Sequence, residues 1–282
     1  MVTIKEESLL LPQLLESFKD MSRTSLKQYL QRGRILVNGT PVTRHDHILH
    51  PGDTIEIGSP HRQTAKLPNC QIIYEDRHLI VIDKAAGILS MATSVRSLNV
   101  KDVLDEYFVR THQPCHAHVV HRLDRDTSGL MVYAKSREVQ QLFEADWKTL
   151  VYDRRYVALV EGSMPQQEGT IKSWLTIGKE YVKSSPVDNG GKLAITHYRV
   201  LQQNEDTSLV EARLDTGRKH QIRVHFASVG CPVVGDRKYG AYPQPLPKGG
   251  EKDSRLMLHA YRLHFIHPVT GEDVKLNLKF VF

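Results

Sequence analysis

A short polar run between two apolar stretches carries side chains that could do chemistry. Residues 119–130 read Val-Val-His-Arg-Leu-Asp-Arg-Asp-Thr-Ser-Gly-Leu, so two carboxylates and two guanidinium groups stand where a plain turn would have sufficed. The carboxylate of Asp124 could serve as a nucleophile or a base. It could equally form a structural ion pair with Arg122, and charge alone leaves both interpretations open.

A second polar stretch, residues 214–225, supplies cations. It reads Leu-Asp-Thr-Gly-Arg-Lys-His-Gln-Ile-Arg-Val-His, and the glycine and proline that follow it predict the end of a helix. A helix that begins near Lys219 or His220 would place Lys219 and Arg223 on one face. Cations on a short helix behind a glycine turn suit the binding of phosphate or carboxylate.

Short strands and a few helices must position these two stretches. Strands are expected at residues 72–74, 79–82, 130–133, 156–160, 209–212, 263–266 and 274–278. Helices are expected at residues 100–108 and 136–150. The irregular spacing of the strands favours an α+β fold, with a mixed, mainly antiparallel sheet and flanking helices, over regular βαβ repeats. The range 240–252, rich in proline and glycine, predicts a surface loop.

The first sixty residues predict a small α/β unit of their own. Ser22 could cap a helix that stops at Gly33, and Asn38-Gly39 predicts a hairpin turn. The charged residues of the range 22–44 are all cationic: Arg23, Lys27, Arg32, Arg34 and Arg44. A helix, a turn and a strand that share one sign of charge favour contact with phosphates, and a solvated helix face is the alternative.

Composition places the chain among globular proteins. It has 282 residues, a net charge of +6 and three scattered cysteines, which give no disulfide framework and fit a reducing compartment. The N-terminus does not read as a signal peptide and no apolar run is long enough for a bilayer, so a soluble cytoplasmic protein is expected. We expect domains at residues 1–58 and 70–282, joined by a linker at 59–69, and nothing demands more than a monomer.

Two sharper interpretations of the residues near Asp124 are rejected. Cys115, His116, His118 and His121 match no standard zinc spacing, so no metal is expected. A glycosidase would need a second carboxylate as its acid, and nothing marks the neighbouring Asp126 as one.

Several motifs in the right order resemble the RluA-type pseudouridine synthases. The pattern His-Arg-Leu-Asp-x-x-Thr-Ser-Gly-Leu is met from His121 to Leu130, and Thr-Gly-Arg-x-His-Gln-Ile-Arg-x-His is met from Thr216 to His225. Tyr-x-Ala-x-Val-x-Gly is met by residues 156–162, and Gly-Asp-x-x-Tyr-Gly by residues 235–240. The family's Lys-Pro-x-Gly is replaced by Lys-Ala-Ala-Gly at residues 84–87, which leaves the geometry of that turn open.

This resemblance implies an isomerase that needs no cofactor. The N1–C1′ bond of a uridine is broken, and C5 of the uracil is joined to C1′. The resemblance implies Asp124 as nucleophile or base, Arg223 as its charge partner, and Tyr156 as the ring that stacks on the uracil and handles the C5 proton. Arg122 would fill the gap left when the nucleotide leaves its stack, and a scaffold pair with Asp126 is the alternative for that arginine.

The N-terminal unit resembles the S4 RNA-binding module. The similarity lies in Ser-Arg-Thr-Ser-Leu-Lys at residues 22–27 and in Gly-Arg-Ile-Leu-Val-Asn-Gly at residues 33–39. Together the two resemblances imply RNA contacts by Arg23, Lys27, Arg34, His121, Arg218 and Lys219. Relatives with an S4 module usually act on large-subunit (23S-type) ribosomal RNA, which is therefore the expected substrate. Transfer RNA is one alternative, and a non-catalytic protein of RNA binding or ribosome assembly is another.

Overall fold

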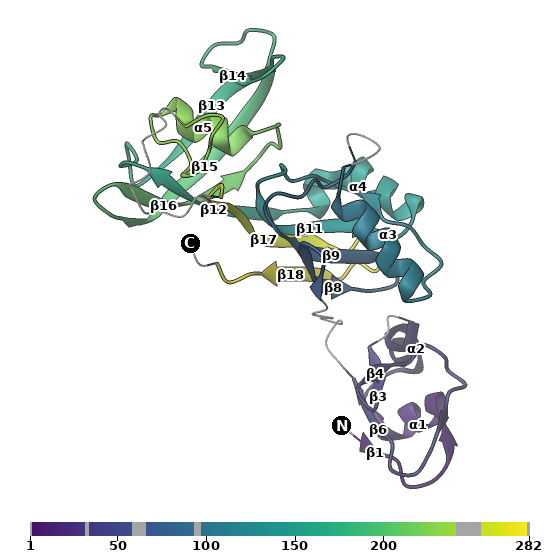
Figure 1. Cartoon of the computed structure of the whole chain (residues 1–282). Coiled ribbons are helices and arrows are strands. Elements are labelled where there is room, and N and C mark those ends of the chain that lie inside the picture. Colours follow the sequence, from purple (N-terminus) through teal and green to yellow (C-terminus); the bar gives the residue numbers. More distant parts are fainter. Residues whose placement is uncertain (1, 32–33, 58–65, 93–96, 241–254, 281–282) are drawn as a thin grey trace, which may run out of the picture. The chain divides into compact units, whose positions relative to one another are not determined.

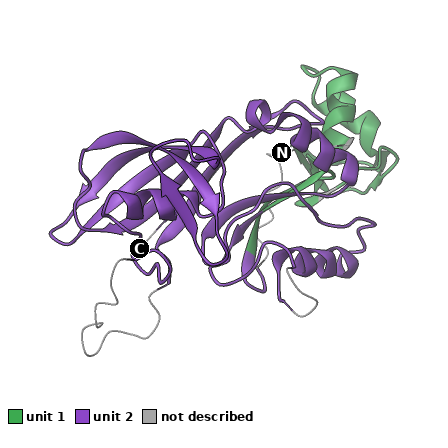
Figure 2. Ribbon diagram, turned by 90° about the horizontal axis from the view of Figure 1, so that it is seen from above, with its two compact units in different colours: residues 1–66, 71–81 green, residues 67–70, 82–282 purple. Residues whose placement is uncertain are grey.

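The computed structural model describes residues 2–31, 34–57, 66–92, 97–240 and 255–280. The chain divides into two compact units, drawn in separate colours in Figure 2: residues 1–66 with 71–81, and residues 67–70 with 82–282. Most of the expected linker and of the expected loop at 240–252 lies outside the described residues. The expected domain limits therefore stay a prediction.

The first unit is built on a small antiparallel sheet. In sheet order its strands are β1 (Val2–Thr3), β6 (Thr54–Ile57), β3 (Ile35–Val37) and β4 (Thr40–Pro41). A separate pair is formed by β2 (Ser8–Leu9) and β5 (Ile48–Leu49). Helices α1 (Leu10–Ser17) and α2 (Arg23–Gln31) accompany these strands. The hydrophobic cluster of these strands and helices includes the fully buried side chains of Leu10, Leu14, Leu26, Ile35, Leu49 and Ile55.

Two local predictions for this unit are confirmed. The hydroxyl of Ser22 accepts a hydrogen bond from the backbone N–H of Ser25 at 3.1 Å, as a helix cap should. Asn38 and Gly39 have φ angles of 52° and 75°, and a two-residue hairpin turn of the I′ type needs a positive φ at both positions. The predicted helix stop at Gly33 lies outside the described residues.

Among the described residues, a 12-stranded sheet carries the candidate site (Figure 1). Its main path is β14-β13-β15-β16-β12-β17-β11-β9-β8-β7, with β10 paired to β11 and β18 to β17. The strands are β7 (Lys66–Leu67), β8 (Cys70–Glu75), β9 (Leu79–Lys84), β10 (His118–Val119), β11 (Ser128–Ala134), β12 (Asp153–Glu161), β13 (Glu168–Ile177), β14 (Val182–Ser185), β15 (Lys192–Gln203), β16 (Thr207–Leu214), β17 (Leu258–Ile266) and β18 (Asp273–Asn277). The pairing is mainly antiparallel, whereas β11 and β17 run parallel. The predicted α+β class is confirmed.

Three helices of the second unit lie against this sheet (Figure 1). They are α3 (Val100–Arg110), α4 (Arg137–Leu150) and α5 (Gln221–Ser228), and the two predicted helices are confirmed as α3 and α4. Asn99 caps α3 by accepting from the N–H of Asp102, and Ser136 caps α4 by accepting from Val139. α4 packs on β11, while α5 packs on β13, β14 and β15. No helix in the described part of the chain is both long and apolar enough to cross a membrane.

The strands β13, β14 and β15 were not predicted. In β15 the buried positions include Ala194, Thr196 and Tyr198, which alternate with partly exposed residues. A strand whose buried face holds small and polar side chains gives only a weak hydrophobic alternation.

The parallel pairing of β11 with β17 joins distant parts of the chain beside the candidate site. Ser128 pairs with His259 and Gly129 with Ala260. The hydroxyl of Ser128 lies 2.9 Å from Nδ1 of His259, a hydrogen bond across 131 residues of sequence. A side chain at Gly129 would meet the carbonyl oxygen of Ala260 at 2.3 Å, so the close approach of the two strands requires glycine there.

Candidate active site

Asp124 lies in the loop between β10 and β11, and the backbone on both sides of it is fixed. Before it, the hydroxyl of Ser90 donates to the carbonyl of Leu123 at 2.8 Å and accepts from the N–H of the same residue at 3.2 Å. After it, the carbonyl of Arg125 accepts from the N–H of Gly87 at 2.9 Å. These bonds hold the carboxylate on a rigid loop, as a reacting group requires.

The ammonium group of Lys84 braces the same loop from inside the fold. The side chain is fully buried, and Nζ donates to the carbonyls of Ala85, Ile88 and Arg125 at 2.9 Å each. Burial lowers the pKa of Lys84 to about 8. The turn that lacks the family's proline is therefore held by a buried cation that also reaches the Asp124 loop.

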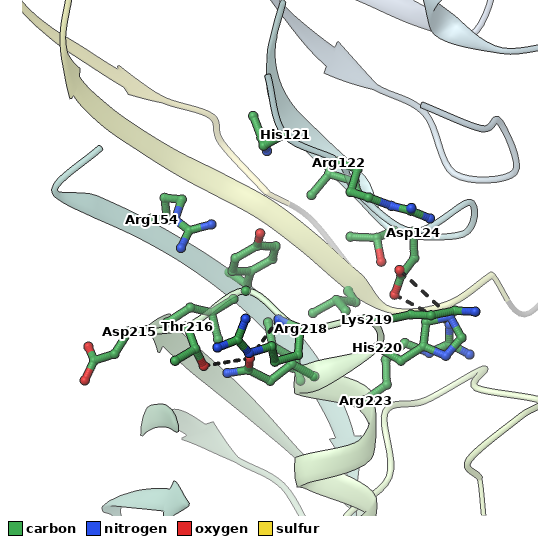
Figure 3. Close-up of a pocket in the computed structure, with 18 of the residues that line it drawn as sticks. His121, Arg122, Asp124, Arg154, Asp215, Thr216, Arg218, Lys219, His220 and Arg223 are labelled. Atoms are coloured by element: carbon green, nitrogen blue, oxygen red, sulfur yellow. Dashed lines mark hydrogen bonds and ion pairs between the residues drawn. The ribbon is translucent and has the colours of Figure 1, made fainter. Parts of the chain in front are cut away.

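The carboxylate of Asp124 faces two nitrogen-bearing side chains of the second polar stretch (Figure 3). Nη1 of Arg223 lies 3.8 Å from Oδ2, and Nε2 of His220 lies 3.9 Å from Oδ1. Both distances exceed a hydrogen bond, so the carboxylate keeps room for a ligand. Asp124 thus forms an ion pair with Arg223, whereas the sequence alone also allowed an ion pair with Arg122.

Arg223 is itself held in place by a buried carboxylate. Its Nε and Nη2 donate to the two oxygens of Asp236 at 2.7 and 2.8 Å, and the Asp236 side chain is fully buried. Burial alone would raise the pKa of Asp236, but the hydrogen bond and charge of Arg223 turn the shift downward. A two-point pair of this kind orients the guanidinium toward Asp124.

The backbone of His220 adopts the left-handed conformation, with φ of 55°, directly before α5. Its Nδ1 lies 2.7 Å from the hydroxyl of Tyr239, and that hydroxyl also accepts from the N–H of Val182 at 3.0 Å. The hydroxyl of Tyr239 can then donate its proton to Nδ1 of His220. A neutral imidazole that accepts at Nδ1 carries its own proton on Nε2, which faces Asp124. Burial lowers the pKa of His220, which favours the neutral form.

The predicted helix near Lys219 or His220 begins later than expected, at Gln221. The side-chain oxygen of Gln221 accepts from the hydroxyl of Thr216 at 2.9 Å and from the N–H of Arg218 at 3.0 Å. This closed turn holds Lys219 outside the helix, so Lys219 and Arg223 do not share a helix face, and that prediction is wrong.

A cavity of about 550 Å³ opens beside Asp124. Tyr156, from β12, lines it together with the apolar side chains of Leu123, Ile222 and Leu258. Its lysine and arginine lining residues are Arg122, Lys148, Arg154, Arg218, Lys219 and Arg223. An apolar interior with convergent polar groups and cations suits a nucleoside attached to phosphates.

Tyr156 is 8% exposed, and burial raises the pKa of its hydroxyl above the ordinary value. Arg154 works against this shift, and the charge of Asp124 adds to it. The ring therefore enters the cavity as a protonated phenol.

His121 lines the same cavity but is tied to the sheet. Its Nε2 accepts from the N–H of Val132 at 3.1 Å, and its ring centroid lies 5.1 Å from that of Trp147. Burial, with a smaller contribution from Arg154, lowers the pKa of His121 to about 3, so the ring is neutral. Arg122 is exposed, and Asp126 pairs with Arg125 at 3.0 Å.

The predicted RNA contacts of the N-terminal unit lie on and after α2. Arg23 and Lys27 are exposed on that helix, and the guanidinium of Arg34 lies 4.3 Å from the ring centroid of Tyr29. They belong to the first compact unit, whereas the cavity belongs to the second.

Sequence reasoning assigned no role to His220, Asp236 or Tyr239. All three stood in the motifs that carried the resemblance, so the signal was present as a pattern. Their contacts depend on a fold that joins residues 182, 220 and 239, which no local pattern reveals.

Comparison with known proteins identifies the fold and the chemistry. A model of the RNA pseudouridylate synthase family matches residues 78–228. The Bacillus subtilis RNA pseudouridine synthase YjbO is 33% identical over 251 residues, 87% of this chain and 86% of that protein. The Vibrio cholerae ribosomal large subunit pseudouridine synthase D is 35% identical, over 93% of this chain and 84% of that protein.

A solved structure agrees with these sequence matches. Human RNA pseudouridylate synthase domain containing 4 superposes with a TM-score of 0.61 at 27% identity, over 74% of this chain and 88% of that one. The resemblance to the RluA-type synthases is thereby confirmed, whereas that of the N-terminal unit to the S4 module stays a prediction, and the non-catalytic alternative is set aside. This chain belongs to the RluA-type family of RNA pseudouridine synthases, which are isomerases.

Proposed function

We propose that the chain converts uridine to pseudouridine in large-subunit ribosomal RNA. The observation that carries the proposal is the 35% identity, over 93% of the chain, to a synthase of the Vibrio cholerae large ribosomal subunit. The S4-like N-terminal unit, with its exposed cations on α2, supports a structured RNA as the partner. A cytoplasmic site of action and a monomer agree with this role.

Asp124 is the group that attacks, as nucleophile or base, in this proposal. The uridine enters the cavity beside it, the N1–C1′ bond breaks, and C5 bonds to C1′. The proton on C5 leaves and N1 gains one, so atoms and electrons balance without a cofactor. Tyr156 stacks on the uracil and handles the C5 proton. Arg223, whose Nη1 lies 3.8 Å from Oδ2 of Asp124, stabilises the negative charge of that carboxylate.

The remaining cations hold the RNA around that uridine. Arg122 takes the place of the flipped nucleotide, which its exposure and its position in the cavity lining support. Arg218 and Lys219 bind phosphates at the rim, and His121 shapes the wall on which the nucleotide lies. Arg23, Lys27 and Arg34 bind the RNA through the S4-like unit.

The test compares wild type with Asp124→Asn on transcripts of the host's large-subunit RNA. Pseudouridine is located by a chemical adduct that stops a primer-extension reaction. We expect the wild-type protein to form it at one or a few uridines, and Asp124→Asn to lose at least about 10⁴-fold in rate while it binds the RNA unchanged. Matching pseudouridines should be missing from a strain that lacks the gene.

Transfer RNA is the second candidate substrate, and the comparisons leave room for it: the chain is also 33% identical to an RNA pseudouridine synthase whose name does not say which RNA it modifies. If wild type modifies transfer RNA transcripts and no ribosomal transcript, the proposed substrate is wrong and the chemistry stands.

A further inference from the structure

A second cavity, of about 920 Å³, meets the first at Asp124. The two cavities share the four residues Arg122, Asp124, His220 and Arg223. The catalytic carboxylate of the proposed function therefore has space on two sides. The uridine needs only the cavity that contains Tyr156, so the second cavity is available for another part of the RNA.

The second cavity presents an exposed aromatic ring. Tyr181 lies between β13 and β14, lines this cavity, and is 49% exposed. Its ring centroid lies 6.2 Å from that of Tyr239, edge-on, and Tyr239 bonds the same His220 that faces Asp124. Two side chains, Tyr239 and His220, thus lie between Tyr181 and the carboxylate of Asp124. This separation suits the binding of the nucleotide next to the target uridine.

Cations line the cavity that holds this ring. The ammonium of Lys238 lies 5.3 Å from the Tyr181 centroid, and Lys179 and Arg237 also line the cavity. Four carboxylates line the cavity, Asp124, Asp126, Glu180 and Asp236, against the seven cations Arg122, Arg125, Lys179, Arg223, Arg237, Lys238 and Arg255. Asp236 is bonded to Arg223 and Asp126 to Arg125. Positive charge beside an exposed aromatic ring is the combination that binds single-stranded nucleic acid, because the ring stacks on a base and the cations bind the backbone.

We propose that the second cavity is a binding subsite for the nucleotide next to the target uridine, with Tyr181 stacked on its base and Lys179 and Lys238 at its phosphate. The proposal rests on the proposed function, since it needs an RNA strand that passes Asp124. A flipped uridine leaves its neighbour without a stacking partner. Tyr181 supplies a replacement that accepts any base, whereas Arg122 fills the gap inside the stack.

The test measures the KM and kcat of Tyr181→Ala on the RNA, ribosomal or transfer, that the wild-type protein modifies. Loss of one stacked base raises KM by about 5- to 100-fold and leaves kcat at saturating RNA nearly unchanged. Tyr181→Phe restores the wild-type KM, because stacking needs the ring and not the hydroxyl. The matched control is Tyr152→Ala, since Tyr152 is 45% exposed and lines neither cavity.

A second measurement identifies the base that stacks. Target RNAs with an abasic nucleotide on the 5′ or the 3′ side of the uridine are compared with intact RNA. For the abasic RNA that lacks the stacked base, the wild-type protein should lose as much affinity as Tyr181→Ala loses on intact RNA. The affinity of Tyr181→Ala should be the same for that abasic RNA and for intact RNA. The subsite would be overturned if, for both abasic RNAs, the loss of affinity due to the missing base simply added to the loss due to Tyr181→Ala. A KM of Tyr181→Ala equal to that of wild type would overturn it as well.

The salt dependence separates the two parts of the subsite. Lys238→Ala should reduce the slope of log K against log salt by about one, and Tyr181→Ala should leave that slope unchanged. The failure of the proposed function would look different: wild type would then form no pseudouridine in ribosomal transcripts, whichever residue stands at position 181.

Discussion

Three side chains of the candidate site come from separate parts of the chain and meet in one cavity. Asp124 follows β10, Tyr156 lies in β12, and Arg223 lies in α5. Their identities could be inferred from the motifs, since residue types and order suffice for a resemblance. The pairing of Arg223 with Asp236 could not, because it depends on how α5 meets the turn after residue 235.

Arg122 offers a prediction at the scale of a single residue. Arg122→Ala should lower kcat/KM on a structured RNA by about 10- to 100-fold, because the displaced base must be held out of the stack without a side chain in its place. On a short oligonucleotide with an unpaired uridine the loss should be no more than about threefold, since little stacking is broken. Steady-state kinetics on the two substrates would decide.

The control is Arg110→Ala, which removes an exposed arginine at the end of α3 and outside both cavities. Equal losses on the paired and unpaired substrates would contradict a wedge role for Arg122 and would favour a simple phosphate contact.

α5 is held to the sheet by a buried histidine. His225 is fully buried, and its two ring nitrogens lie 2.8 Å from the hydroxyl of Thr196 on β15 and 3.0 Å from that of Ser173 on β13. Since α5 also carries Arg223, these two hydrogen bonds help to fix the position of Arg223 relative to Asp124. The sequence predicts a helix here. Its first residue depends on the hydrogen bond that the side chain of Gln221 accepts from the N–H of Arg218, and helix propensities do not include such a contact.

The same histidine predicts acid sensitivity at the scale of this element. Burial lowers the pKa of His225 to about 4, so as pH falls below about 6.5 the unfolded chain takes up a proton that the folded chain refuses. The free energy of unfolding should then fall between pH 6.5 and pH 4, by at most about 1.4 kcal/mol per pH unit from this residue.

Urea denaturation across that pH range would measure the effect. His225→Gln, which keeps hydrogen-bonding groups but has no titration, should show a shallower fall than wild type. His116→Gln serves as the control, because the His116 side chain is 77% exposed. Parallel curves for wild type and His225→Gln would count against the assignment.

The whole molecule combines a catalytic sheet with a small unit that carries its own cations. The small unit could be predicted well, because its turn and its cap are local: Asn38-Gly39 and Ser22 act within a few residues. The large sheet could be predicted only as a class. Its strand order, with β17 inserted between β12 and β11, arises from pairings across long stretches of sequence.

The role of the small unit yields a prediction at this scale. The double variant Arg23→Ala/Lys27→Ala should reduce the slope of log K against log salt for RNA binding by about 0.7–0.9 for each phosphate that the protein no longer neutralises. A filter-binding titration at several salt concentrations would measure it. Lys5→Ala/Lys19→Ala removes the same charge from positions outside the range 22–44, and it should leave the slope unchanged. Identical slopes for the two double variants would rule out the proposed phosphate binding.

The parallel pairing of β11 with β17 also determines when the enzyme can begin to work. Chains leave the ribosome from the N-terminus, so Asp124 and its loop emerge long before residues 258–266 exist. Until then β11 has β9 and β10 beside it but lacks β17, and Ser128 lacks the histidine 131 residues further on. A nascent chain therefore carries the proposed reacting residue before the site is complete, and we expect activity only after β17 has been made and has paired with β11.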